Sequence, residues 1–529
     1  MNCEAIMNAI KKTNMKVSKL LKYLSICSFL WMNGLSSCTK LDEELFTQVP
    51  VTDFGKDDEQ INALVGSIYS TLKLNGIDWD TYITMSGLAS DMIAIPGFKG
   101  GDWSEPMYKE TMRHTWTASS SGFNDCYFQP SANISLCNQI FYQINVSQGL
   151  DPTLKQRILA EIRGVRAFWY YILIDLYGNV PIVTDFLDQS QPATKTRAEV
   201  YAFIVKELTE IKDLLRKDVA TPASYGKFTR GAAYTLLAKM YLNAMVWNPA
   251  GGAKWKEAAA ACDSVIDMPY QLEAWKTNFV PNNDISREAI LSAAFKAGGS
   301  GRQNMIAFNT LHYFDPIALG LTLAPWNGIA ANPDYVESFD TTDARYRGSF
   351  LIGPMRDPST GDIIMTAHGR PLIHTVEMTM HDLGPDGWGW INQEEGARIY
   401  KWDFEPGLSS TMENDFHIFR LADVYLMKAE AILRDGGSPS DALPLVNAIR
   451  ARGLPNKLYT TLTLDDIYNE RRFELAWEGF TRQDMIRYGK FLAARPPFKP
   501  YISDSKYLLF PIPQAAIDAN PKLVQNPGY

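Results

Sequence analysis

The clearest pattern in the chain is an apolar stripe between residues 158 and 176. Its members recur at intervals of four and three, which places them on one face of an α-helix. They are Ile158, Ile162, Val165, Trp169, Ile172 and Leu176. Gly178, Asn179 and Pro181 follow, and such residues are typical of a helix end. The pattern therefore predicts one long helix that packs into a core.

Similar patterns predict helices on both sides of this one. In the N-terminal half they cover residues 197–215, a segment that begins at Thr229, and residues 254–268. After Phe416 an apolar stripe returns, Gly436 and Gly437 interrupt it, and residues 440–452 form its partner helix. Two of these helices share the spacing of the second helix of a tetratricopeptide repeat. Their apolar positions are Ala258, Cys262 and Val265 in one, and Ala442, Val446 and Ile449 in the other. The spacing alone predicts a mostly α fold of paired, repeat-like helices.

The pattern changes between about residues 281 and 415. This segment is rich in Gly, Pro, Asn and aromatic residues, with short strand-like runs at 289–295 and 398–402. Turn-forming residues between periodic segments are typical of loops. We therefore expect a loop-rich insertion with short β-strands. It would belong to a C-terminal region, residues 281–529, that follows an N-terminal helical region, residues 58–280.

The first 37 residues predict a secretory signal rather than part of the fold. Five lysines between residues 11 and 22 precede an uncharged apolar run at 23–35, and Ser36, Ser37 and Cys38 follow. The run is too short to span a bilayer. If Met15 were the true start, the basic stretch would open the peptide at once. Residues 38–57 would form a tether.

The quartet LSSC at residues 35–38 resembles a bacterial lipobox, in which the cysteine carries lipid. The alternative is ordinary signal cleavage beside an incidental cysteine. The acidic residues at 42–44 resemble the surface-export signal of Bacteroidetes lipoproteins. The two resemblances imply a lipid anchor at Cys38 and a location on the surface of the outer membrane.

Charge and cysteine content exclude several classes of protein. Removing residues 1–37 takes away five lysines and one glutamate, so the formal charge moves from −8 to −12. An acidic protein gains nothing from phosphate backbones, which argues against nucleic acid as a partner. Beside Cys38, only Cys126, Cys137 and Cys262 remain, too few for a disulfide framework or a zinc site. A Cys126–Cys137 bridge stays open.

Five segments, in order, resemble the SusD/RagB family of outer-membrane nutrient-binding lipoproteins. They span nearly the whole mature chain and follow the lipobox. They are EIRGVRAFWYYILIDLYGNVPIVT (161–184), TRGAAYTLLAKMYLN (229–243), FRLADVYLMKAEA (419–431), IYNERRFELAWEGFTRQDMIRYG (467–489) and LFPIPQAAIDANPKLVQNPGY (509–529).

This resemblance implies a fold, a superhelix of tetratricopeptide-like helix pairs. It implies a function as well. It implies a protein that captures oligosaccharide and passes it to a TonB-dependent transporter of the SusC type, without being an enzyme. Some members of the family are thought to carry peptides, so a peptide cargo stays open. A third interpretation is a structural subunit of the transporter complex that contacts no cargo.

The segment ERRFELAWEG invites a catalytic interpretation. Glu470, Glu474 and Glu478 recur every four residues and would share one helix face. A surface glycoside hydrolase would need two such acids beside a sugar. Arginines lie close by, however, and a salt-bridged glutamate makes a poor general acid. We therefore predict a structural ion network, with no catalytic residue, from Glu470, Arg471, Glu474, Glu478, Arg482, Asp484 and Arg487.

Several aromatic residues lie in loops rather than on helical stripes. Tryptophans at 103, 326, 388 and 390 lie among Gly and Pro, whereas those at 169, 255 and 477 lie on stripes. A flat aromatic ring in a surface loop can stack on a sugar, or it can close the base of its own loop. We expect the first three of the following aromatics to meet on one exposed face, with polar neighbours that bond hydroxyls. The ligand-binding candidates are Trp103, Tyr313, Trp326, Trp388, Trp390, Arg302, Asn304 and Asn327.

No cofactor motif stands out. His368, His374 and His381 show no metal-binding helix pattern, and no lysine after a glycine is followed by Ser or Thr as in a phosphate loop. We expect no cofactor and no metal site. Structural calcium stays open, because the acidic loop at 334–343 offers oxygen ligands.

Overall fold

The computed structural model describes residues 58–78, 81–101, 103–299 and 301–529. The predicted signal, the tether and Cys38 lie outside the described residues. All described residues belong to one compact unit. Helices dominate this unit, as the apolar spacing predicted, and its strands are at most five residues long. Within the described ranges, no helix is both long and apolar enough to cross a bilayer.

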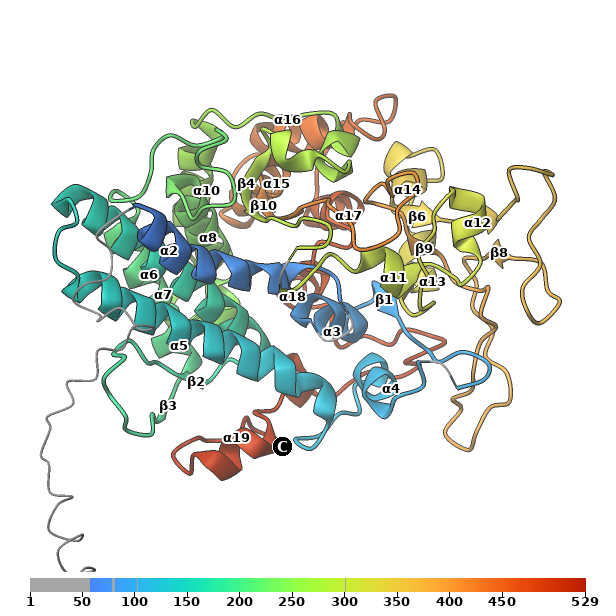
Figure 1. Ribbon diagram of the computed structural model, residues 1–529, viewed down its shortest axis with the longest axis horizontal. Coiled ribbons are helices and arrows are strands. Elements are labelled where there is room, and N and C mark those ends of the chain that lie inside the picture. The colour runs from blue at the N-terminus through green and yellow to red at the C-terminus, as the bar shows by residue number, and fades with distance from the viewer. Residues whose placement is uncertain (1–57, 79–80, 102, 300) are drawn as a thin grey trace, which may run out of the picture. The chain divides into compact units, whose positions relative to one another are not determined.

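The first part of the described chain is a group of packed helices. They are α2 (Asp58–Thr71), α3 (Tyr82–Ala89), α4 (Pro106–Arg113), α5 (Asn124–Val146), α6 (Pro152–Leu176), α7 (Arg197–Ile211), α8 (Arg230–Leu242), α9 (Ala244–Trp247) and α10 (Trp255–Ile266). The predicted stripe lies on α6, which packs against α2, α5, α7 and α8 (Figure 1). Because neighbours cover more than one of its sides, nearly every residue from Ile158 to Leu176 is buried.

Local signals explain where α6 begins and ends. The Asp151 side chain accepts a hydrogen bond from the amide of Leu154 at 2.9 Å, and Pro152 occupies the first turn. Both features favour a helix start. After Leu176 the chain reaches Gly178 at φ +69°, a conformation that glycine adopts without strain. The helix therefore stops where the sequence predicted.

The C-terminal helices pack onto the first group. They are α15 (Leu421–Arg434), α16 (Pro439–Arg450), α17 (Leu464–Glu474), α18 (Thr481–Arg487) and α19 (Gln514–Ala519). Helix α15 contacts α10 on one side and α16 and α17 on another, and α10 also contacts α8. Buried Ala422, Ala429 and Ala442 line these contacts, and small side chains let helices approach closely. The predicted helix pairs are thus present.

The region between these groups holds short elements. Its helices are α11 (Ile306–Thr310), α12 (Asp315–Leu319), α13 (Pro333–Glu337) and α14 (Ala344–Ser349). The strands form five antiparallel pairs: β1 (Ile93–Ala94) with β5 (Ala330–Ala331), β2 (Val180–Pro181) with β3 (Thr194–Lys195), β4 (Ala289–Ala293) with β10 (Phe416–Arg420), β6 (Phe350–Leu351) with β9 (Arg398–Ile399), and β7 (Gly353–Pro354) with β8 (Ile373–His374). The β1–β5 pair places the loop before α4 beside the middle region.

Several predicted boundaries were wrong, among them the end of the strand predicted over 289–295, which ends at Ala293. The helix predicted directly after Phe416 is preceded by strand β10, all five of whose residues are buried against β4. A short, fully buried strand has no alternation, so apolar spacing alone does not separate it from a helix. The helix predicted to residue 215 ends at Ile211, and the strand predicted over 398–402 ends at Ile399.

The open question of a Cys126–Cys137 bridge is answered by α5. Both residues lie on this one helix and are buried free thiols, as is Cys262. Eleven residues along an α-helix rise by about 16 Å, whereas bridged cysteines need Cα atoms within about 7 Å. The bridge is therefore excluded.

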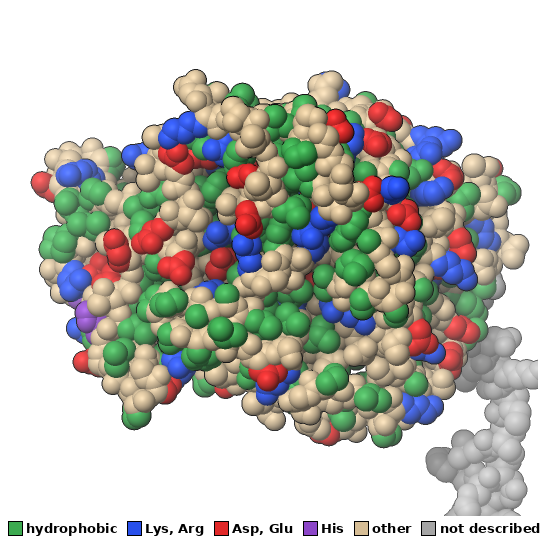
Figure 2. Space-filling model, turned by 180° about the vertical axis from the view of Figure 1, so that it is seen from behind, with side chains coloured by type: hydrophobic (Ala, Val, Ile, Leu, Met, Phe, Trp, Pro, Cys, Tyr) green, Lys and Arg blue, Asp and Glu red, His purple; other side chains and the backbone are tan. Residues whose placement is uncertain are grey.

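Charges of both signs are spread over the surface. Figure 2 shows Lys and Arg side chains intermixed with Asp and Glu on one face of the described unit, with apolar side chains between them. This face carries no broad field of a single sign.

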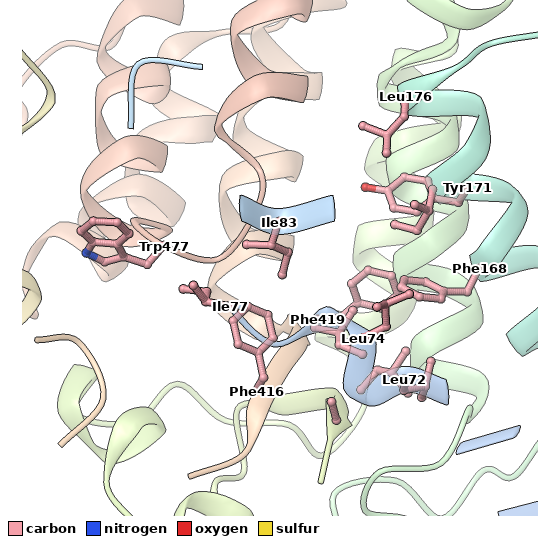
Figure 3. Close-up of a cluster of buried hydrophobic side chains, with 14 of the residues drawn as sticks. Leu72, Leu74, Ile77, Ile83, Phe168, Tyr171, Leu176, Phe416, Phe419 and Trp477 are labelled. Atoms are coloured by element: carbon pink, nitrogen blue, oxygen red, sulfur yellow. The ribbon is translucent and has the colours of Figure 1, made fainter. Parts of the chain in front are cut away.

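The core joins segments that are far apart in sequence. Leu72 and Leu74 follow α2, Phe168 comes from α6, and Phe419 from β10, and all are buried (Figure 3). Trp477, beyond α17, lies in the same cluster and is fully buried. The N-terminal and C-terminal regions therefore share one core, which fixes the loops that they carry.

Candidate functional site

Trp103 lies in the loop between β1 and α4 and reaches the middle region. Its indole Nε1 donates a hydrogen bond to the carbonyl oxygen of Trp326 at 2.7 Å. Its ring lies so close to Gly328 that a Cβ there would be 2.3 Å from it. The backbone of Trp103 has φ +53°, which is uncommon for any residue but glycine. Contacts with the middle region therefore hold this half-buried ring in place.

The loops that carry Tyr313 and Trp326 run beside each other. The amide of Trp326 donates to Phe308 at 2.7 Å, and the amide of Asn327 donates to Leu311 at 3.0 Å. Tyr313 is 39 % exposed and Trp326 is 40 % exposed. Together with the Trp103 bond, these contacts bring the three loops of the predicted platform into one neighbourhood, although Trp103 and Trp326 are 223 residues apart.

Trp103 also lines a cavity of about 430 Å³. Three of the predicted tryptophans line it: Trp103, Trp388 and Trp390. The loop at 95–101 and the first turn of α4 complete the wall, where Gly97, Gly100 and Gly101 have positive φ. We call this cavity the tryptophan pocket. Tyr313 and Trp326 do not line it.

Trp388 and Trp390 lie on a hairpin at residues 381–390. His381 and Trp390 exchange two main-chain hydrogen bonds, of 2.8 and 3.1 Å. Gly384 and Trp388 close the turn with a bond of 2.8 Å, and Gly387 adopts φ +71° there. The indole Nε1 of Trp390 donates to Asp382 at 2.9 Å. The hairpin therefore presents two half-buried indoles, separated by Gly389, to the pocket.

Cations lie against the indoles of the hairpin. The ammonium of Lys99 is 5.1 Å from the ring centre of Trp390. Lys109 and Arg113, both on α4, lie 5.8 and 5.7 Å from the ring centre of Trp388. These distances are within the range of cation–π attraction. Cations of the 95–101 loop and of α4 therefore lie against both indoles of the hairpin.

Two of the three predicted polar ligand residues are buried in contacts within the protein. Asn304 is buried and donates to the carbonyl of Asn414 at 2.8 Å. Asn327 is fully buried and donates to the carbonyl of Gln393 at 3.1 Å. For these two the prediction was wrong, because each amide ties its own loop to a neighbour. Arg302 pairs with Asp78 at 3.3 Å and also donates to Gln129.

The three glutamates of the predicted ion network are buried in ion pairs. Glu474 contacts Arg420 at 2.6 Å, Arg452 at 2.5 Å and Arg345 at 3.1 Å. Burial alone would raise the pKa of the Glu474 carboxyl, but the charges of these arginines outweigh it and lower the pKa to about 2. A carboxylate held ionised in this way does not serve as a general acid.

Two details of that prediction were wrong. Glu478 is not on the helix of the other two, because α17 ends at Glu474 and Trp477 turns the chain at φ +68°. Glu478 pairs instead with Arg420 at 2.6 Å and with Lys401 at 2.5 Å. In addition, none of the three glutamates pairs with an arginine of its own segment. All of their cationic partners come from elsewhere in the chain.

The arginines of the segment form a second cluster. Arg471 contacts Asp423 and Asp484, both at 2.8 Å. Arg487 contacts Glu430 and Asp484, both at 2.7 Å, so Asp484 pairs within the predicted network. This cluster joins α15, α17 and α18, and a separate pair of Arg482 with Asp175 at 3.1 Å ties α18 to α6.

The predicted calcium loop holds acids that already have cationic partners. Asp340 pairs with Lys457, and Asp343 pairs with Arg345 at 2.8 Å. Across the described ranges, no group of three or more His, Cys, Asp or Glu has a metal-binding arrangement. Structural calcium at this loop stays a prediction.

The sequence did not mark one ion pair at the hairpin. Lys109 and Asp386 form an ion pair between α4 and the hairpin tip. Each is an ordinary surface residue in the sequence, and 277 positions separate them, so no local pattern marks the pair. The two tryptophans themselves were marked by their Gly- and Pro-rich loop.

The chain is similar to proteins of the SusD family. A family model described as "SusD family" matches residues 287–529, and one described as "Starch-binding associating with outer membrane" matches residues 81–242. "Starch-binding protein SusD" of Bacteroides thetaiotaomicron is 27 % identical over 463 residues, which cover 78 % of this chain and 80 % of that protein. "SusD-like protein P38" of Formosa agariphila is 35 % identical over 413 residues, covering 72 % and 75 %.

Solved structures share the fold. Surface glycan-binding protein A of Bacteroides thetaiotaomicron, in complex with laminarihexaose, superposes with a TM-score of 0.70 at 20 % identity. The superposition covers 89 % of this chain and 99 % of that structure.

Proposed function

Because the chain belongs to the SusD/RagB family, we propose that it binds glycan at the surface of the outer membrane. Relatives named for starch binding and for a laminarihexaose complex support an oligosaccharide as the ligand. The chain would then pass the glycan to a TonB-dependent transporter of the SusC type. Cys38 would carry the lipid anchor, and residues 38–57 would link it to the folded unit.

The tryptophan pocket is the observation that carries this proposal. Sugar rings have apolar C–H faces that stack on indoles, while their hydroxyls bond nearby polar groups. A volume of about 430 Å³ is within the usual range for a small-molecule site. Tyr313 and Trp326 lie outside the pocket on the loops that contact Trp103, and both are partly exposed. They are a second aromatic surface that an oligosaccharide could use.

The charges around the pocket favour a neutral glycan. Lys109 is neutralised by Asp386, and Lys99 lies against the Trp390 ring. Among the described residues that line the pocket, Glu105 is the one carboxylate. Glycoside hydrolysis uses two carboxyl groups on either side of the scissile bond. This arrangement supports binding without hydrolysis.

A glycan panel tests the proposal. The purified protein is incubated with laminarihexaose, a maltooligosaccharide, a uronic-acid oligosaccharide and a peptide mixture, and both retention and new reducing ends are measured. We expect retention of a neutral oligosaccharide and no new reducing ends. Trp103→Ala and Trp388→Ala should each weaken binding about fivefold, as for one aromatic contact.

Phe186→Ala is the matched control, since Phe186 is an aromatic of similar exposure, 38 %, in another loop. It should leave affinity unchanged. Retention of peptide alone, release of reducing ends, or full affinity in both tryptophan variants would contradict the proposal.

A further inference from the structure

The hairpin at residues 381–390 is attached to the molecule at its base and at its tip. At the base, the amide of Lys99 donates to the carbonyl of Ile391 at 2.9 Å, and the amide of Ile391 donates to Gly97 at 3.1 Å. These main-chain bonds do not depend on side-chain charge. At the tip, Asp386 forms an ion pair with Lys109 of α4. The two attachments therefore respond differently to salt and to substitution.

Asp386 links α4 directly to the backbone of a pocket tryptophan. One carboxylate oxygen pairs with the ammonium of Lys109, and the other accepts a hydrogen bond from the amide of Trp388 at 3.2 Å. The same ammonium lies 5.8 Å from the centre of the Trp388 ring. A single lysine thus contacts both the ring and the residue that holds its backbone.

The ion pair is accessible to solvent. The side chain of Lys109 is 36 % exposed and that of Asp386 is 50 % exposed. Exposed pairs are weak and are screened by salt. A contact of this strength biases the position of a short hairpin without locking it.

Trp388 and Trp103 both line the pocket, but the segments that carry them are attached in different ways. Trp103 is fixed to the middle region by its bond to Trp326, whereas Trp388 is on the hairpin. We propose that the Lys109–Asp386 ion pair positions the hairpin over α4 and so sets the spacing of Trp388 and Trp103 across the tryptophan pocket. Lys109 and Asp386 are then positioning residues for the ligand, and the inference rests on the proposed glycan function.

This arrangement makes the affinity for a neutral ligand depend on salt. Stacking of an uncharged sugar on an indole involves no ion pair, so by itself it changes little with ionic strength. If a screened ion pair sets the position of one wall, salt weakens binding indirectly. Raising the ionic strength from about 0.01 M to about 1 M shortens the Debye length from about 30 Å to about 3 Å. We expect binding to weaken about threefold over this range, as for the loss of one exposed pair.

Hydrogen exchange in the glycan-free protein tests the positioning role directly. In the purified full chain, Lys109→Met should speed exchange of the hairpin amides of Gly384 and Gly387 about threefold. Lys109→Arg keeps the charge and should restore slow exchange. Lys457→Met is the matched control, because Lys457 forms an exposed ion pair with Asp340 elsewhere. It should leave hairpin exchange unchanged.

Binding measurements with laminarihexaose complete the test. Lys109→Met should bind about threefold more weakly at low salt, and its affinity should no longer vary with salt. Hairpin exchange in Lys109→Met equal to that of the unaltered protein would overturn the inference, whatever the glycan result. If no glycan binds but exchange behaves as expected, the positioning role stands and the proposed ligand is wrong. Salt dependence that persists in Lys109→Met would also overturn it.

Discussion

At the scale of single residues, the sequence indicated which side chains are ionised in the core but not the cationic partners of the three glutamates. Glu470 and Glu474 share one face of α17, whereas Arg471 points about 100° away from Glu470 around the helix axis. Adjacent residues on a helix do not face each other. The glutamates therefore meet Arg345, Arg420 and other cations that only the tertiary fold supplies.

We expect Glu474→Gln to destabilise the protein strongly. The substitution keeps the volume but removes the charge that Arg345, Arg420 and Arg452 share. Breaking a buried pair on one side typically costs about 3–5 kcal/mol. Urea denaturation monitored by fluorescence measures the loss. Glu210→Gln is the control, because Glu210 pairs with Arg163 at the surface, where its side chain is 47 % exposed. Equal stability of the two variants would show that the core network contributes nothing.

Acid should unfold the protein by protonating buried carboxylates of the ion clusters. The carboxyls of Glu474, Glu430 and Asp423 are buried, which raises their pKa, but neighbouring cations lower each to about 2. Their ordinary values are 4.5 and 3.8. Because the folded pKa is depressed, their stabilisation is present above about pH 4.5 and is lost as the pH falls toward 2. The urea concentration at the denaturation midpoint, measured from pH 6 to pH 2, should decrease between about pH 4.5 and pH 2. The fall should be smaller in Glu474→Gln, and an equal fall would refute the assignment.

At the scale of elements, apolar spacing predicted helices only where one stripe dominates. It marked α6 but missed α5, whose 23 residues include Pro130 and many polar side chains. The buried positions of α5 include Ile134, Cys137 and Ile144, a narrow stripe that loop-forming residues obscure. The candidate site was likewise predicted only in part. Gly- and Pro-rich loops pointed to the tryptophans, but their meeting depends on the β1–β5 pair and the shared core.

Two helix glycines give opposite predictions for the same substitution. In α6, a Cβ at Gly164 would be 2.2 Å from the buried ring of Phe228, so Gly164→Ala should destabilise by about 1–3 kcal/mol. In α2, no atom lies within 4 Å of a Cβ at Gly66. Gly66→Ala should stabilise by about 0.5–1 kcal/mol, because alanine loses less entropy in a helix. Thermal melts of both variants check the pair. A stabilising Gly164→Ala would mean that α6 and Phe228 are not in contact.

At the scale of the whole molecule, the proposed anchor and the candidate binding site lie in different parts of the chain. The described unit from Asp58 onward holds the core, the ion clusters and the tryptophan pocket. The proposed anchor, Cys38, precedes it by 20 residues. The chain is acidic, with a formal net charge of −8, and anionic headgroups attract basic rather than acidic segments. We therefore expect membrane attachment to depend on lipid rather than on charge.

We expect Cys38→Ala to abolish membrane attachment and to leave glycan binding intact. One acyl chain binds a membrane only marginally, and stable anchoring takes more than one. We propose that Cys38 carries these chains, so its replacement removes the whole attachment. Metabolic labelling with a palmitate analogue, followed by membrane fractionation, measures both consequences. The variant should carry no label and remain in the soluble fraction, while its affinity for the retained oligosaccharide equals that of the anchored protein. Cys262→Ala is the control, because Cys262 is a buried thiol of α10, and its label and fractionation should not change. A Cys38→Ala protein that still partitions with membranes after a high-salt wash would show that something other than this lipid holds it there.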